Sequence, residues 1–119
     1  MLAGRPVTID GDGEQARDML HVADVAVANI AALDRGAGGT YHISSGVPVT
    51  VNELFRKLAL LTDYKLEPTF GPLRKGDVFR IALDNTKARN DLGWEPRVEL
   101  EEGLSLTVDY FREQVLSAH

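Results

Sequence analysis

The chain has 119 residues, of which 44% are hydrophobic, and a formal net charge of −5 from 13 basic and 18 acidic side chains. This length suits one domain with a modest core, and the acidic balance argues against a general nucleic-acid or anionic-membrane surface. The absence of cysteine excludes disulfides, thiolate nucleophiles and cysteine-rich zinc sites. No apolar run approaches the roughly 20 residues of a membrane span and no signal peptide is apparent, so we expect a soluble, cytoplasmic protein.

The first third of the sequence predicts short strands around one helix. Residues 6–10 are rich in β-branched side chains and predict a strand, which Gly11, Asp12 and Gly13 end in a turn. Residues 17–22 alternate weakly and predict a second strand. Asp24 can cap or charge the start of a helix that runs to about Leu33. A glycine-rich loop follows, and residues 40–43 predict a further short strand.

Three more helices are predicted in the rest of the chain. Thr50 and Glu53 match a capping box, in which hydroxyl and carboxylate each satisfy the other's free backbone N–H, so a helix should run to about residue 62. Asp84 is placed to cap a helix of about two turns, and Gly93 to end it in a left-handed conformation. Residues 100–116 predict the last helix. Trp94 is expected to anchor the core at the end of the short helix.

The loop between Gly71 and Asp84 carries the most suggestive chemistry. Arg74 offers a planar fork of donors that suits phosphate or carboxylate oxygens. Asp77 can only accept hydrogen bonds and suits hydroxyl groups, as on a ribose. Gly76 between them lets the backbone approach a ligand closely. Taken alone, however, such a charged stretch is more often a solvated surface loop.

Other kinds of site find little support in the sequence. The Gly11-Asp12-Gly13 run lacks a third glycine and does not open a helix, so it is not a dinucleotide fingerprint. The three histidines, His21, His42 and His119, lack metal-site spacing, and we expect no metal. His21 is expected to be structural.

Three blocks of residues, in a fixed order and spacing, carry a resemblance. The first is Gly11-Asp12-Gly13-x-Gln15-x-Arg17-Asp18 with His21-Val22-x-Asp24-Val25-Ala26, and the second is Tyr41-His42-Ile43-x-Ser45-Gly46. The third is Pro72-x-Arg74-x-Gly76-Asp77 with Asp84-x-x-Lys87-Ala88, Leu92-Gly93-Trp94-x-Pro96 and Leu100-Glu101-Glu102-Gly103-Leu104. Together these blocks, over about residues 5–113, resemble the C-terminal part of NAD-dependent nucleotide-sugar epimerases and dehydratases. These are extended short-chain dehydrogenase/reductases, typified by UDP-galactose 4-epimerase.

The resemblance implies roles for five residues. Arg17 and Arg74 would contact the substrate diphosphate from two sides, and Asp77 would accept a hydrogen bond from the nucleotide ribose. Backbone groups near Thr8 and Asp10 would lie along the base. An aromatic residue is common in the family where Asp10 stands.

The resemblance also implies a fold and a parent enzyme. The chain would be α/β and helix-dominated, with about four helices and short strands. Residues 1–119 would form a single C-terminal substrate-binding fragment whose N-terminal NAD-binding Rossmann domain is missing. The parent would be an NAD-dependent epimerase that removes and returns a hydride at the sugar carbon of a nucleotide sugar, with UDP as the expected nucleotide. The alternatives are a dehydratase, decarboxylase or reductase of the same family, or a non-catalytic binding or regulatory protein.

The family's catalytic Tyr-x-x-x-Lys pair is absent. The residues four positions after Tyr41, Tyr64 and Tyr110 are Ser, Pro and Gln. The chain alone should therefore be inactive.

In the full-length family, the segment at about residues 22–43 and the final helix pack against the cofactor domain. Their apolar faces would be uncovered here, so we expect the isolated chain to self-associate as a homo-oligomer. For the first helix this face comprises Val22, Val25, Ala26, Ile30 and Leu33.

Overall fold

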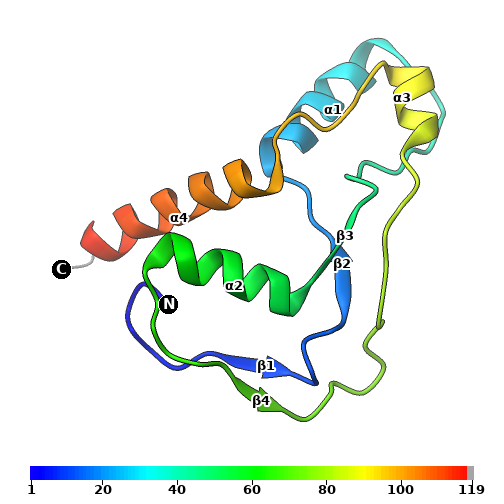
Figure 1. Ribbon diagram of the computed structural model, residues 1–119. Coiled ribbons are helices and arrows are strands. Elements are labelled where there is room, and N and C mark those ends of the chain that lie inside the picture. The colour runs from blue at the N-terminus through cyan, green and yellow to red at the C-terminus, as the bar shows by residue number, and fades with distance from the viewer. Residues whose placement is uncertain (118–119) are drawn as a thin grey trace.

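Two small sheets and four helices make up the part of the chain described by the computed structural model, residues 1–117 (Figure 1). The helices are α1 (Val22–Asp34), α2 (Val51–Thr62), α3 (Thr86–Leu92) and α4 (Leu100–Ser117). The expected helix-dominated α/β fold is confirmed, and the helix predicted at residues 100–116 matches α4 almost residue for residue.

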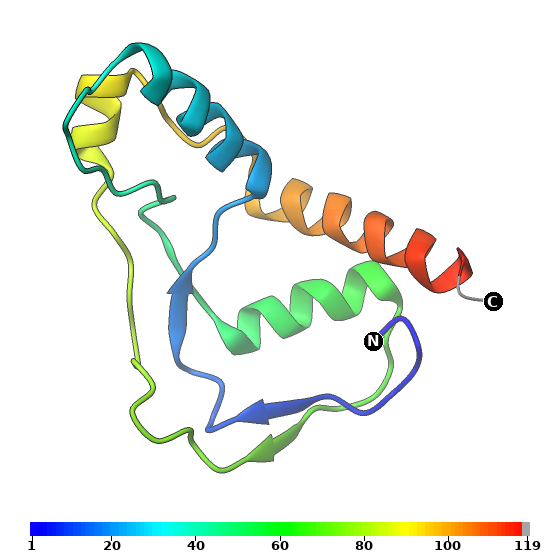
Figure 2. The ribbon, with the colours of Figure 1, turned by 180° about the vertical axis from the view of Figure 1, so that it is seen from behind.

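The two sheets have two strands each. β1 (Thr8–Asp10) runs parallel to β4 (Thr69–Gly71), with Ile9 opposite Phe70. β2 (Ala16–Asp18) runs antiparallel to β3 (Pro48–Thr50), with Arg17 opposite Val49. β3 leads directly into α2, which lies beside the sheets when the molecule is seen from either side (Figures 1 and 2).

The strand predictions were only partly correct. The strand expected at residues 6–10 forms as the shorter β1, and that expected at residues 17–22 is β2, which ends at Asp18. The strand expected at residues 40–43 does not form, and β3 and β4 were not predicted. A strand exists only where another backbone pairs with it, and within residues 1–117 no strand lies alongside residues 40–43.

The helix ends follow their local signals more closely. Thr50 Oγ1 accepts a hydrogen bond from the Glu53 N–H at 3.1 Å, which confirms the hydroxyl half of the capping box. Asp84 Oδ1 accepts from the Thr86 N–H at 2.9 Å, although Asn85 occupies the cap position of α3. Gly93 ends α3 with a φ of 63°, as predicted.

Of the two roles predicted for Asp24 at the start of α1, the capping role is wrong, and the placement of its charge in the first turn is confirmed. The helix begins two residues before Asp24, and the capping residue is His21, whose Nδ1 accepts from the Ala23 N–H at 3.1 Å. His21 is therefore structural, as expected. Asp24 is buried in the first turn, and its carboxylate accepts hydrogen bonds from the N–H groups of Arg97 and Val98, both at 3.1 Å.

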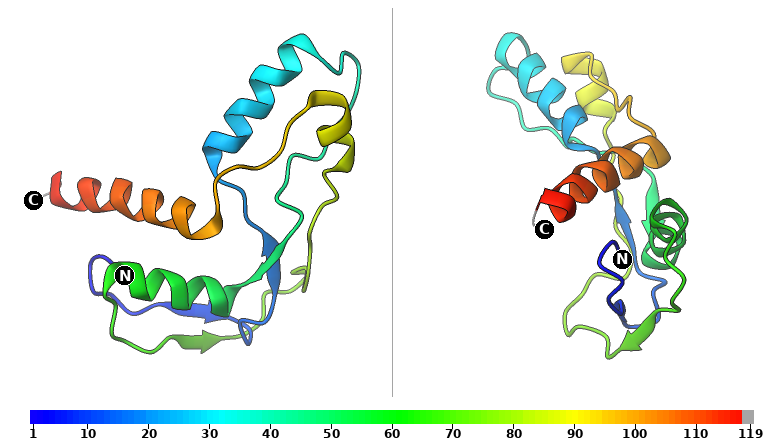
Figure 3. Two further views of the ribbon diagram at one scale, coloured as in Figure 1. Left: turned by 45° about the horizontal axis from the view of Figure 1, so that its top comes forward. Right: turned by 90° about the vertical axis from the view of Figure 1, so that its left-hand side faces the viewer.

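The principal core cluster lies where α1 and α3 meet, at one end of the molecule (Figure 3). It comprises Ala28, Ala88, Leu92 and Trp94. The Trp94 side chain is 3% exposed, and its Nε1–H donates to the Asp24 carbonyl at 2.9 Å. Trp94 is thus the predicted core anchor.

Among residues 1–117, no helix is both long and apolar enough to cross a membrane.

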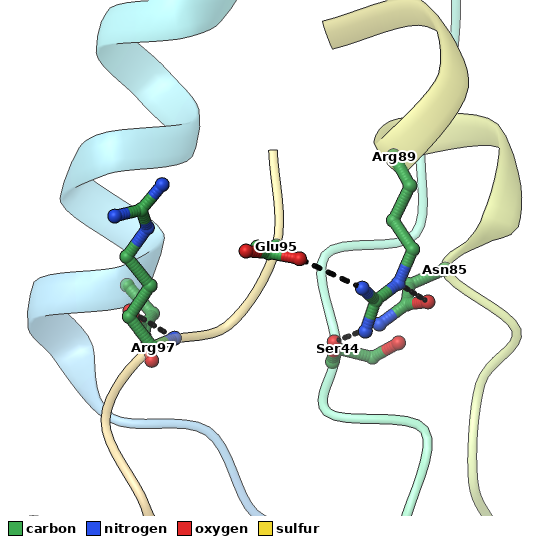
Figure 4. Close-up of polar contacts among 6 residues, drawn as sticks. Ser44, Asn85, Arg89, Glu95 and Arg97 are labelled. Carbon is green, nitrogen blue, oxygen red and sulfur yellow. Dashed lines mark hydrogen bonds and ion pairs between the residues drawn. The ribbon is translucent and has the colours of Figure 1, made fainter. Parts of the chain in front are cut away.

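A polar network fastens α3 to its neighbours (Figure 4). The Asn85 amide donates to the Ser44 carbonyl at 2.8 Å and accepts from Arg89 Nε at 2.9 Å. Arg89 also pairs with Glu95 at 3.2 Å. Asn85 is buried, so these hydrogen bonds take the place of those that its amide would make with water in the unfolded chain.

Candidate functional site

The loop that follows β4 turns sharply at the residues singled out from the sequence. The Asp77 N–H donates to the Arg74 carbonyl at 3.1 Å, which closes a turn over Gly76. Gly76 has a φ of 80°, a conformation that glycine adopts without strain, and a Cβ placed there would meet open space. The turn presents the Arg74 and Asp77 side chains from one short segment.

Backbone hydrogen bonds bring this loop beside Arg17. The Ala16 N–H donates to the Phe79 carbonyl at 2.7 Å, and the Ile81 N–H donates to the Ala16 carbonyl at 3.1 Å. At the other end of the loop, the Gly11 N–H donates to the Gly71 carbonyl at 3.0 Å. The loop is therefore held at both ends against the segment that carries β1 and β2.

A cavity of about 580 Å³ lies between these elements. Its wall includes one face of α2, the strand β1, and the Arg74–Asp77 turn. The lining residues are Met1, Val7, Thr8, Ile9, Asp10, Gln15, Arg17, Val51, Leu54, Phe55, Leu58, Arg74 and Asp77. All five residues predicted from the sequence line this one cavity, although they lie as far apart as positions 8 and 77. The wall from α2 is mainly apolar.

Two of the predicted residues bind each other. Arg17 Nη2 donates to Asp77 Oδ1 at 2.5 Å, and the two side chains are 29% and 26% exposed. Arg17 Nη1 donates to the carbonyl of Ala16 at 2.9 Å. The resemblance gave these two residues separate tasks, on the diphosphate and on the ribose, and it did not predict that they would be paired.

Two further predicted residues, Thr8 and Asp10, lie on β1. The Thr8 hydroxyl is 2.9 Å from that of Thr69 across the parallel pair. Asp10 is the last residue of β1 and belongs to the wall of the cavity. The wall of the cavity therefore includes two arginines and two aspartates.

Gln15 is a cavity residue that the sequence reasoning missed as a site residue. Its Nε2 donates to the Asp10 carbonyl at 2.7 Å, which fixes the end of β1. Its Oε1 is buried and has no hydrogen-bond partner among residues 1–117. The signal that could have found it is its fixed place in the Gly-Asp-Gly-x-Gln-x-Arg-Asp block.

Asp18, next to Arg17, fixes the far end of β2. Its carboxylate accepts hydrogen bonds from the N–H groups of Ser45, Gly46 and Leu83 and from the Ser45 hydroxyl, at 2.8–3.3 Å. Burial alone would raise the pKa of Asp18, but these hydrogen bonds outweigh it and hold the pKa below its usual value. The role of Asp18 is thus to position the backbone at Ser45, Gly46 and Leu83 rather than to bind a ligand.

Within residues 1–117, His, Asp and Glu side chains nowhere gather in a group of three or more suited to a metal ion. The Tyr41 hydroxyl, which donates to Asp91 at 3.2 Å, lies near α3 and not in the cavity wall described above.

The chain matches a known family over almost its whole length. The model of the family described as GDP-mannose 4,6 dehydratase matches residues 1–107. The UDP-glucose 4-epimerase of Mycolicibacterium smegmatis is 42% identical over 113 residues, which cover 94% of this chain and 36% of that protein.

Solved structures agree with this match. The UDP-glucose 4-epimerase of Thermotoga maritima, crystallised with UDP-glucose, superimposes with a TM-score of 0.95 at 50% identity, over 97% of this chain and 37% of that one. The UDP-glucose 4-epimerase of Thermus thermophilus, in complex with NAD, gives a TM-score of 0.83 at 36% identity, over 93% and 37%. The chain thus spans little more than a third of the relatives that it matches.

Proposed function

Because the chain belongs to the extended short-chain dehydrogenase/reductase family of NAD-dependent sugar-nucleotide epimerases and dehydratases, we propose that its cavity binds the nucleotide diphosphate of a sugar nucleotide. In this proposal Arg17 and Arg74 bind the diphosphate and Asp77 binds the ribose. The base lies along β1, near Thr8 and Asp10. The observation that carries the proposal is that all five residues line one cavity.

The chemistry of the cavity suits such a ligand. Two guanidinium groups can neutralise a diphosphate and fix its orientation, because each offers parallel donors to a pair of oxygens. The volume of about 580 Å³ lies within the range of small-molecule sites. The apolar side chains of Leu54, Phe55 and Leu58 offer a surface on which a flat base can lie. Binding energy gained here, away from the reacting carbon, can hold the sugar in place for chemistry elsewhere.

For the whole protein we propose a UDP-glucose 4-epimerase-like activity, with removal and return of a hydride at a sugar carbon. Its support is the identity of 42–50% to UDP-glucose 4-epimerases of two bacteria. The description of the family model supports a second candidate, a sugar-nucleotide dehydratase. Incubation of the whole protein with UDP-glucose tests the choice, since an epimerase yields UDP-galactose and a dehydratase releases water to give a keto-sugar.

The glycine-containing turn at residues 11–13 does not fit the pyrophosphate of NAD. The turn at residues 11–13 joins β1 to β2 instead of opening a helix, so it lacks the helix N-terminus that receives a pyrophosphate. A Cβ at Gly13 would also lie 2.0 Å from the side chain of Asn52, which fills the space over the turn. We therefore propose that NAD is held by a separate Rossmann domain. A cytoplasmic location remains a prediction.

The binding proposal is tested by titrating UDP into the purified chain by calorimetry. We expect weak binding that falls at least about tenfold in Arg74→Ala and in Arg17→Ala, since each loses a charge-assisted fork on the diphosphate. Arg56→Ala is the matched control, because Arg56 lines a different cavity, and should bind UDP as the wild type does. Equal UDP affinity in Arg74→Ala and wild type would rule the proposal out.

A further inference from the structure

The guanidinium group of Arg17 is paired within the chain. Its Nη2 donates to Asp77 and its Nη1 donates to the carbonyl of Ala16, which uses two of its five N–H groups. An anion that binds Arg17 therefore competes with the carboxylate of Asp77 for the same positive charge. It also approaches the negative charge of that carboxylate within the same cavity.

We infer that Asp77 is a specificity-determining residue, which competes with the ligand's diphosphate for Arg17 and so selects ligands that also carry a ribose. This inference rests on the proposed function. A bare diphosphate that competes for Arg17 lies beside the negative charge of the carboxylate and offers that carboxylate no donor. A nucleoside diphosphate competes for the same positive charge but offers ribose hydroxyls, which can donate to the carboxylate in place of Arg17.

The two partners of the pair are held differently. Arg17 lies at the centre of β2, which pairs with β3. Its neighbour Ala16 is 1% exposed and makes backbone hydrogen bonds to Phe79 and Ile81. Asp77 lies in a loop whose residues 72–80 are all exposed. The exchange of partners therefore falls to Asp77, which can turn from Arg17 to a ribose without disturbing either sheet.

The inference is tested by measuring the dissociation constants of UDP and of inorganic pyrophosphate, by calorimetry, for the wild type and for Asp77→Asn. The substitution preserves shape but removes the charge. We expect Asp77→Asn to bind pyrophosphate about three- to tenfold more tightly than the wild type, the gain expected from the loss of one competing, partly exposed ion pair and one like charge. UDP should gain less or bind more weakly, since the ribose loses a charged acceptor.

Asp63→Asn is the matched control, because it removes one carboxylate from an exposed ion pair with Lys65 and Asp63 lines a different cavity. The affinity for pyrophosphate should not change in this variant. An equal gain in affinity in both variants would mean that the effect comes from net charge alone, and would overturn the inference. If the wild type binds UDP but Asp77→Asn gains nothing for pyrophosphate, the inference alone is wrong. If the wild type binds neither probe, the proposed function fails and the inference fails with it.

Discussion

Asp18 shows how much a single side chain organises in this small fold. Its carboxylate joins the end of β2 to the turn at Ser45 and Gly46 and to the backbone at Leu83, three segments far apart in the sequence. Hydrogen bonds to a charged acceptor are stronger than neutral ones, and all of these are weakened together if the charge is lost. The stability contributed by Asp18 should therefore depend on pH.

We predict that Asp18→Asn lowers the free energy of unfolding by about 2 kcal/mol at pH 7, because an amide cannot accept from several N–H groups with the strength of a carboxylate. The folded-state pKa of Asp18 is lowered from 3.8, so its contribution is present above about pH 4 and is lost as the pH falls through the lowered pKa. Urea unfolding, followed by the fluorescence of the single tryptophan, should show the difference between wild type and variant shrinking below pH 4.

Asp109→Asn, on the exposed side of α4, is the control and should change stability little at any pH. A destabilisation by Asp18→Asn that is the same at pH 7 and pH 3 would contradict this account. Asp84 and Glu101 also have lowered pKa values, from hydrogen bonds with Thr86 and Lys57 respectively, but they are unchanged in both proteins and cancel in the comparison.

At the scale of the element, the helices are held by different partners. α2 packs against α4, where Lys57 reaches Glu101 at 2.5 Å, and α1 packs against α3 around Trp94. The α1–α3 contact relies on few buried side chains, since α3 has only seven residues and buries Ala88 and Leu92. A short helix has little stability of its own, so this contact must hold α3 in place.

We predict that Trp94→Ala lowers the free energy of unfolding by about 3–4 kcal/mol, because it leaves a cavity between α1 and α3. Trp94→Phe keeps most of the ring volume and loses the hydrogen bond to the Asp24 carbonyl, so it should cost about 1–2 kcal/mol. Thermal unfolding followed by circular dichroism measures both. If Trp94→Ala and Trp94→Phe unfold at the same temperature, the ring does not anchor this contact.

At the scale of the whole molecule, the chain is less compact than a typical domain of its length. Its radius of gyration is 16.9 Å, against about 13.5 Å for a compact domain of this length. Its accessible surface is 8225 Å², against about 6,300 Å² for a typical monomer of 13.0 kDa. The excess of about 1,900 Å² is comparable to the area that a protein–protein interface buries.

The apolar face of α1 that was expected to be uncovered is exposed. Val22, Ile30 and Leu33 belong to this face, and they are 64–84% exposed.

Self-association of the isolated chain therefore remains our prediction. Sedimentation velocity over a range of concentrations should show dimers or larger species, because burial of this apolar face removes it from water. Ile30→Lys should shift the distribution toward monomer. Asn90→Lys is the control, because it adds the same charge at an exposed position of α3, outside the predicted face, and should leave the distribution unchanged. A compact monomer at high concentration would refute the prediction.

The sequence by itself determined the helices, the family and the residues proposed to bind a ligand. Thr50, Asp84 and Gly93 act on backbone groups within a few residues, so their signals can be interpreted without knowing the fold. The motifs that carry the resemblance are likewise local blocks. From them came the five residues that line one cavity, although their roles in binding remain proposals.

Only the tertiary structure decided the strands, the ion pair and the exposed surface. A three-residue strand such as β3 or β4 exists because another backbone lies beside it, and the same reason leaves residues 40–43 without a strand. Arg17 and Asp77 are 60 positions apart, and their contact depends on the bonds that fasten the loop to Ala16. The carboxylate of the buried Asp24 accepts from the N–H of Arg97, which is 73 positions away in the sequence. These features arise from which surfaces meet, and no local pattern of residues specifies that.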